Sequence, residues 1–84
     1  MKIYDLQLRI NRIASNIKSL RIAKGYSQEY MGMKLNMSQN TFSKIELGHV
    51  ELTVKRLIQI AEVLEVDVHD LLCSDNSQVL AISQ

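Results

Sequence analysis

The chain is short of residues that build special sites: among 84 residues it has no proline or tryptophan, one cysteine and three glycines. The single cysteine, Cys73, excludes an internal disulfide and has no histidine or second cysteine at metal-ligand spacing. His49 and His69 fall in different kinds of segment, a loop and a short helix, so no metal site is expected. Also missing are a glycine-rich phosphate loop, a nucleophile triad and paired carboxylates. We therefore expect neither an enzyme nor a cofactor.

Long apolar runs are missing too. No stretch approaches the roughly 20 apolar residues that span a bilayer. The N-terminal sequence "MKIYDLQLRI" has Asp5, Gln7 and Arg9 where a signal peptide has an apolar block. The composition, 46% hydrophobic and 23% charged, is typical of soluble globular proteins, and 84 residues suffice for one small domain. The sequence thus predicts a cytoplasmic protein with no membrane partner and no evident small-molecule ligand.

Basic residues are absent from the C-terminal third of the chain. Residues 57–84 carry five acidic and no basic residues, whereas residues 1–56 carry all ten lysines and arginines and only four acidic residues. The first part could therefore attract a polyanion such as nucleic acid. Small domains also carry uneven charge without a function, so charge alone leaves the partner open.

Helix boundaries have to be read from capping residues, because proline is absent and glycine is rare. One pattern occurs four times: an apolar residue, then Ser, Thr or Asp, then another apolar residue four positions later. Its instances are Tyr26-Ser27…Met31, Met37-Ser38…Phe42, Leu52-Thr53…Leu57 and Val66-Asp67…Leu71. Each fits an N-cap with a hydrophobic staple, while Gly25, Asn36 and Gly48 can end helices. The pattern predicts helices over residues 28–35, 39–46, 54–64 and 68–72, after a first helix that ends near Lys24.

The N-terminal segment allows two interpretations. Six aliphatic residues have the spacing of a heptad repeat, which favours one long helix: Ile3, Leu6, Ile10, Ile13, Ile17 and Leu20. Alternation of apolar and polar residues over 4–10 instead allows a short strand before a helix that starts near Ser15. We divide the chain into an N-terminal extension of the first helix (1–14), a helical domain (15–72) and a tail (73–84). The tail ends in an apolar strip around Leu80, either frayed or covering an apolar surface of its own or a partner chain.

The helices predicted over 28–35 and 39–46 have helix-turn-helix spacing. Only three residues, 36–38, join them, which forces the two helices to cross steeply. Gly32 allows the second helix of the pair to approach closely. Phe42 and Ile45 mark the buried face of that second helix. The residues on its opposite, solvent-facing side are Gln39, Asn40, Ser43 and Lys44.

These segments resemble the lambda Cro and repressor-like (XRE-type) helix-turn-helix family. The likeness covers residues 17–72 and is carried by "LRIAKGYSQEYMGMKL", "NMSQNTFSKIELG" and "LTVKRLIQIAEVLEVDVHDLL". It implies an all-α, five-helix DNA-binding domain. Gly32 stands where the family usually has alanine, and Asn36 where it usually has glycine. The loop "HVEL" after Gly48 replaces basic residues and a proline, which counts against the phosphate contacts usual for that loop.

The resemblance implies a sequence-specific transcriptional regulator, a repressor or autoregulator, that binds double-stranded DNA at a palindromic operator as a homodimer. The residues expected to read bases are Gln39, Asn40, Ser43 and Lys44. Those expected to contact phosphates are Ser27, Gln28, Ser38, Thr41 and Lys55.

The resemblance also implies a structural ion pair between Arg21 and Glu46. Such a pair more often fixes geometry than adds net stability. The rival hypothesis is a helical protein-interaction module, or an antitoxin-type partner binder, with weak or no DNA binding. It is supported by the "HVEL" loop and by the low net charge of +1.

Overall fold

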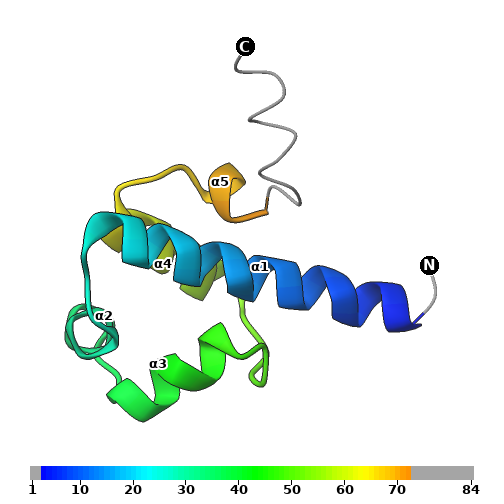
Figure 1. Cartoon of the computed structure of the whole chain (residues 1–84), viewed down its shortest axis with the longest axis horizontal. Coiled ribbons are helices and arrows are strands. Elements are labelled where there is room, and N and C mark those ends of the chain that lie inside the picture. Colours follow the sequence, from blue (N-terminus) through cyan, green and yellow to red (C-terminus); the bar gives the residue numbers. More distant parts are fainter. Residues whose placement is uncertain (1–2, 73–84) are drawn as a thin grey trace.

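The computed structural model describes residues 3–72, with side chains from Asp5 onward, and this part of the chain is entirely helical between its connecting turns. Its helices are α1 (Ile3–Lys24), α2 (Gln28–Leu35), α3 (Gln39–Glu46), α4 (Val54–Leu64) and α5 (Val68–Leu72). The all-α fold and the bounds of the last four helices are confirmed. The long first helix is also confirmed, and the strand considered for residues 4–10 is wrong. Figure 1 shows α1 running across the molecule, with α2 and α3 on one side of it and α5 on the other.

The predicted N-caps form through local hydrogen bonds. The side-chain oxygens of Ser27, Ser38 and Thr53 each accept from the backbone N–H three residues further on, at 2.9–3.0 Å. At the start of α5, Asp67 Oδ1 accepts from the backbone N–H of His69 at 3.0 Å. These bonds use donors that the first turn of a helix leaves without intrahelical partners, so the capping residues determine where each helix begins.

The first four helices end in the same way. Each places one residue in the left-handed conformation, and the next residue donates its N–H to a carbonyl five positions earlier, as in a Schellman motif. The left-handed residues are Gly25, Asn36, Gly48 and Glu65, with φ of 77°, 63°, 76° and 60°. The first three are the helix ends predicted from the sequence. Glu65 was not predicted, because glutamate has no special preference for this conformation.

One core joins all five helices. Six side chains are less than 2% exposed: Phe42, Ile17, Met31, Ile60, Leu64 and Leu71. The heptad row on α1 enters this core only with its C-terminal half, since Leu6 and Ile10 remain 50% and 36% exposed. Figure 1 shows the reason: the N-terminal half of α1 projects beyond the other helices. The extension predicted for residues 1–14 is therefore continuous with α1 from Ile3 onward, and the tail 73–84 lies outside the described residues.

Candidate nucleic-acid interface

The turn between α2 and α3 is tight because Gly32 has no side chain. A Cβ at this position would lie 2.7 Å from the carbonyl oxygen of Met37 and 3.2 Å from the carbonyl carbon of Ser38. The N–H of Met37 also donates to the carbonyl of Gly32 at 2.8 Å. Backbone therefore packs directly on backbone, and the direction in which α3 leaves the turn is set by α2.

Helix α3 presents a polar face opposite its buried face. Phe42 and Ile45 are 0% and 3% exposed and attach the helix to the core. Gln39, Asn40 and Lys44 are exposed, and Ser43 is half-buried at the edge of the same face. The structure thus brings all four predicted base-reading residues to an accessible surface. Three of these side chains are exposed there, while the half-buried Ser43 has less room for a partner.

The hydroxyls at the start of α3 are already paired with each other. Ser38 Oγ accepts from the backbone N–H of Thr41 at 3.0 Å and donates to Thr41 Oγ1 at 2.9 Å. Since a hydroxyl carries one proton, the proton of Thr41 is left available for an outside acceptor. Ser38 can accept from other donors but has no second proton to give. Of these two predicted phosphate contacts, Thr41 is therefore the better hydrogen-bond donor.

The start of α2 is connected to the end of α3 by a bond that the sequence did not indicate. Gln28 is half-buried, and its Nε2 donates to Glu46 Oε1 at 2.9 Å. One amide proton of Gln28 is used inside the protein, and the second amide proton is the one that could reach a phosphate. Ser27, the cap before it, is exposed. A glutamine at the first position of a surface helix gives no local sign of such a bond, because its partner is 18 residues away.

Arg21 and Glu46 meet at the centre of this arrangement. Arg21 Nε lies 2.6 Å from Glu46 Oε2, and Arg21 Nη2 lies 3.1 Å from Glu46 Oε1. Arg21 Nη1 also donates to the carbonyl of Tyr26 at 2.9 Å. The two side chains are only 11% and 2% exposed, so the bidentate pair is shielded from water and salt. Together with Gln28, it ties α1, the connection to α2, and α3 into one unit.

The two basic residues at the start of α4 have different surroundings. Arg56 Nη1 donates to the carbonyl of Leu35 at 3.2 Å and to Gln59 Oε1 at 3.0 Å. Arg56 therefore supplies a hydrogen-bond donor to the C-terminal end of α2, where carbonyls lack helical partners. Lys55 is exposed. Of the two residues, Lys55 thus remains the phosphate-binding candidate, while Arg56 is engaged inside the protein.

The apolar residues of the loop between α3 and α4 face inward. Val50 and Leu52 are half-buried and pack on the core, while His49 and Glu51 are exposed. The loop therefore contributes to packing and presents no lysine or arginine.

The helix-turn-helix described above is also found in known proteins. A sequence model described as helix-turn-helix matches residues 17–71, well over half of the chain. The chain belongs to the XRE-type helix-turn-helix family. This family groups transcriptional regulators and is not a class of enzymes, in agreement with the prediction from the sequence.

One relative of this helix-turn-helix protein is similar over most of the chain. The SPbeta prophage-derived uncharacterized HTH-type transcriptional regulator YonR of Bacillus subtilis (strain 168) is 32% identical over 62 residues, which make up 74% of this chain and 57% of YonR. The chain thus spans little more than half the length of that relative.

Two solved structures resemble the helix-turn-helix chain. The clp gene regulator ClgR from C. glutamicum has a TM-score of 0.71 at 25% identity, covering 77% of this chain and 83% of ClgR. The hypothetical transcription factor NHTF from Neisseria has a TM-score of 0.81 at 20% identity, covering 93% of this chain and 88% of NHTF. The likeness to NHTF shows the shared fold.

None of the helices within residues 3–72 combines the length and the apolar character needed to cross a membrane. In that same part of the chain, His, Cys, Asp and Glu side chains do not gather in groups of three that could hold a metal ion.

Proposed function

We propose that this chain is a DNA-binding transcriptional regulator, a repressor or autoregulator, that binds a palindromic operator as a homodimer in the cytoplasm. The observation that carries the proposal is the polar face of α3, held by the buried Phe42 and Ile45 and by the Arg21–Glu46 pair. A helix that reads base edges needs a fixed direction and exposed polar side chains near its start, and α3 has both.

The chemistry of that face suits the major groove. Gln39 and Asn40 carry amides that can bond adenine in a bidentate manner, and Lys44 can donate to guanine. Ser43 completes the set as a short donor and acceptor at the edge of the face. Gln39 and Asn40 occupy the first two positions of α3, the end of a recognition helix that reaches the base edges.

The five proposed phosphate contacts share a structural position. Ser27 and Gln28 begin α2, Ser38 and Thr41 lie in the first turn of α3, and Lys55 lies in the first turn of α4. Helix starts attract anions, because their backbone N–H groups lack helical partners and the helix dipole is positive there. Three such starts would hold the DNA backbone on either side of the groove that α3 enters.

A dimer would place two copies of α3 in successive major grooves, about 34 Å apart. Helix α4 offers apolar surface for a second copy, since Val54 and Ile58 are 72% and 44% exposed and lie about one turn apart. Sedimentation of the protein alone and with operator tests this part of the proposal. A chain that stays monomeric on its selected DNA would contradict it.

The first experiment selects bound fragments from random or genomic DNA and measures affinity for the recovered sequence and for random DNA. Gln39→Ala should weaken binding to the selected sequence by about 1–3 kcal/mol and relax the preference at one base pair. Equal losses on selected and random DNA would reject Gln39 as a base reader. The symmetry and spacing of the recovered sequence test the palindrome directly.

A salt series separates base contacts from phosphate contacts. Lys55→Ala should weaken all sequences about equally and reduce the slope of log affinity against log salt by about 0.9 per protomer. Lys24→Ala is the matched control, because Lys24 Nζ instead pairs with Glu65 Oε1 at 3.3 Å and its removal changes the total charge by the same amount. The same slope change for both variants would show that Lys55 acts only through net charge.

The rival function, a protein-interaction module, predicts a different outcome. It is favoured by the uncharged packing of Val50 and Leu52 in the loop after α3. Failure of the protein at micromolar concentration to retard any genomic fragment at 50 mM salt would favour this rival and reject DNA binding.

A further inference from the structure

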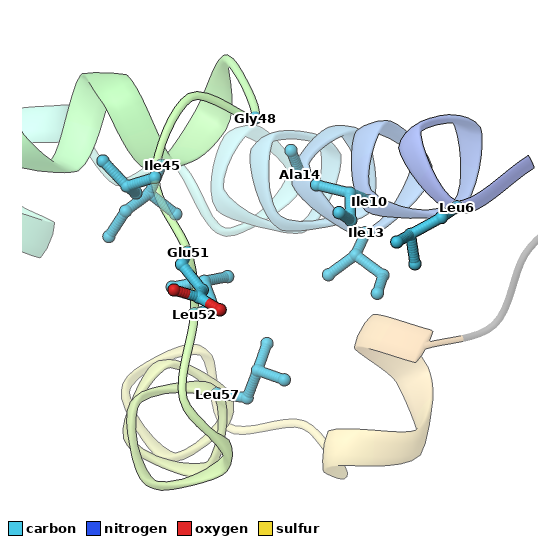
Figure 2. Close-up of a pocket in the computed structure, with 10 residues that line it drawn as sticks. Leu6, Ile10, Ile13, Ala14, Ile45, Gly48, Glu51, Leu52 and Leu57 are labelled. Carbon is cyan, nitrogen blue, oxygen red and sulfur yellow. The ribbon is translucent and has the colours of Figure 1, made fainter. Parts of the chain in front are cut away.

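An apolar groove lies beneath the projecting half of α1. Its volume is about 310 Å³, and its main lining residues are Leu6, Ile10, Ile13, Val50, Leu52 and Leu57. Figure 2 shows Leu6, Ile10 and Ile13 along α1 on one side, with Leu52 and Leu57 facing them from the loop after α3 and from α4. Glu51 is the charged member of the lining. An occupant must therefore be mainly aliphatic.

The groove is separate from the proposed DNA surface. None of the nine candidate DNA contacts lines it. Its upper wall is the part of α1 that extends beyond the core, where Leu6 is 50% exposed. Exposed aliphatic surface next to a preformed hollow is unfavourable in water and is typical of a docking site.

The described structure ends beside this groove. Helix α5 packs against both α1 and α4, which form two of the groove walls. The amide of Asn16 on α1 fastens α5 by donating to the carbonyl of Leu71 at 3.0 Å. The chain then continues from Leu72, which is 48% exposed, for twelve further residues.

The sequence of those residues matches the needs of the groove. Residues 73–78, "CSDNSQ", are polar and can span up to about 20 Å when extended. The next residues, 79–82, are "VLAI", and no charged residue follows Asp75. An uncharged aliphatic segment thus follows a polar linker of six residues.

We propose that residues 79–82 occupy the groove of their own chain. A short linker gives an attached segment an effective concentration in the millimolar range, whereas a second copy competes only at its solution concentration. At micromolar protein the attached segment therefore has the advantage. The docked tail covers Leu6 and Ile10 and holds the projecting half of α1 against the loop after α3. This inference does not depend on DNA binding.

A spin label tests the position of the tail in the full chain. Cys73→Ser combined with Ser83→Cys moves the single thiol to the end of the apolar segment, where it can carry a nitroxide. The methyl signals of Leu6 and Leu57 should broaden, while that of the exposed Met33 on α2, a helix that contributes no residue to the groove lining, should broaden least. Broadening that occurs only between differently labelled chains, or no broadening at the groove, would overturn the proposal.

A double-mutant cycle tests the energetic coupling. Leu80→Asn and Leu6→Asn should each lower the urea midpoint of unfolding by about 1 M. The double variant should have a midpoint only slightly below those of the single variants, because both substitutions remove the same contact. Leu8→Asn is the matched control: Leu8 is 52% exposed on the same helix but lies by a different hollow with Asp5 and Arg9. Leu8→Asn should therefore combine additively with Leu80→Asn.

Two results, one from this cycle and one from sedimentation of the same variants, would count against the docked tail. Additive losses for Leu6→Asn and Leu80→Asn would show that the two residues do not touch. A dimer that dissociates on Leu6→Asn but is unaffected by Leu80→Asn, measured by sedimentation, would assign the groove to a second copy of the chain.

Discussion

Gly32→Ala tests how the turn between α2 and α3 sets the recognition helix. The new Cβ would lie 2.7 Å from the Met37 carbonyl oxygen and 3.3 Å from the backbone nitrogen of Gln39. Ordinary contact begins at 3.4 Å, so the turn must move by about 0.7 Å. All the obstructing atoms are backbone, so no side chain can rotate to make room. An alanine, common at this position in the family, fits here only if the start of α3 shifts.

Two effects of opposite sign decide the stability of this variant. Alanine favours the helix over glycine by about 1 kcal/mol. Overpacking a close contact typically costs about 1–3 kcal/mol. We expect the free energy of unfolding to fall by about 1 kcal/mol, as measured by urea denaturation. We also expect the amide NMR signals of α3 to shift and the affinity for operator DNA to fall.

Gly25→Ala is the control for backbone strain alone. Gly25 has φ of 77°, and a Cβ there would meet nothing within 4 Å. Gly25→Ala should lower the free energy of unfolding by about 1–2 kcal/mol, because alanine is strained in the left-handed conformation, and it should leave α3 in place. If Gly32→Ala gained the full helix-propensity benefit and left the α3 signals unchanged, the close approach would not control the helix, and the reasoning would be refuted.

Three further features of the scaffold can be tested by substitution and urea denaturation. Arg21→Met leaves the carboxylate of Glu46 without its bidentate partner and should lower the free energy of unfolding by about 3–5 kcal/mol. The double variant Arg21→Met with Glu46→Leu should lower it by less, and additive losses would refute the coupling. Ser38→Ala should cost about 1 kcal/mol and speed amide exchange at the start of α3, and unchanged exchange would contradict the cap. Glu65→Gly should raise the free energy of unfolding by up to about 1 kcal/mol, because glycine adopts the left-handed conformation of this position without strain. Loss of the exposed pair with Lys24 should subtract little from this gain, and a fall in the free energy of unfolding would contradict the prediction.

Part of the candidate site could be predicted from local sequence. Ser38 and the apolar pair Met37 and Phe42 lie within six residues, so the start of α3 and its buried face were readable without any distant contact. The exposure of Gln39 and Asn40 followed, because helix geometry places them away from Phe42 and Ile45. The Arg21–Glu46 pair was implied by the family resemblance and is present in the structure.

The amino-acid sequence by itself determined the end of the first helix and the bounds of the other four, because caps and left-handed residues act over four or five positions. The tertiary structure decided which polar groups were already engaged. Gln28 bonds Glu46 and Arg56 bonds the carbonyl of Leu35, across 18 and 21 positions, and neither bond has a local sign. It also divided the uniform aliphatic row of α1 between the core and an open groove. The physical reason is that burial depends on what packs opposite a helix face, and the other helices do not extend far enough to cover Leu6.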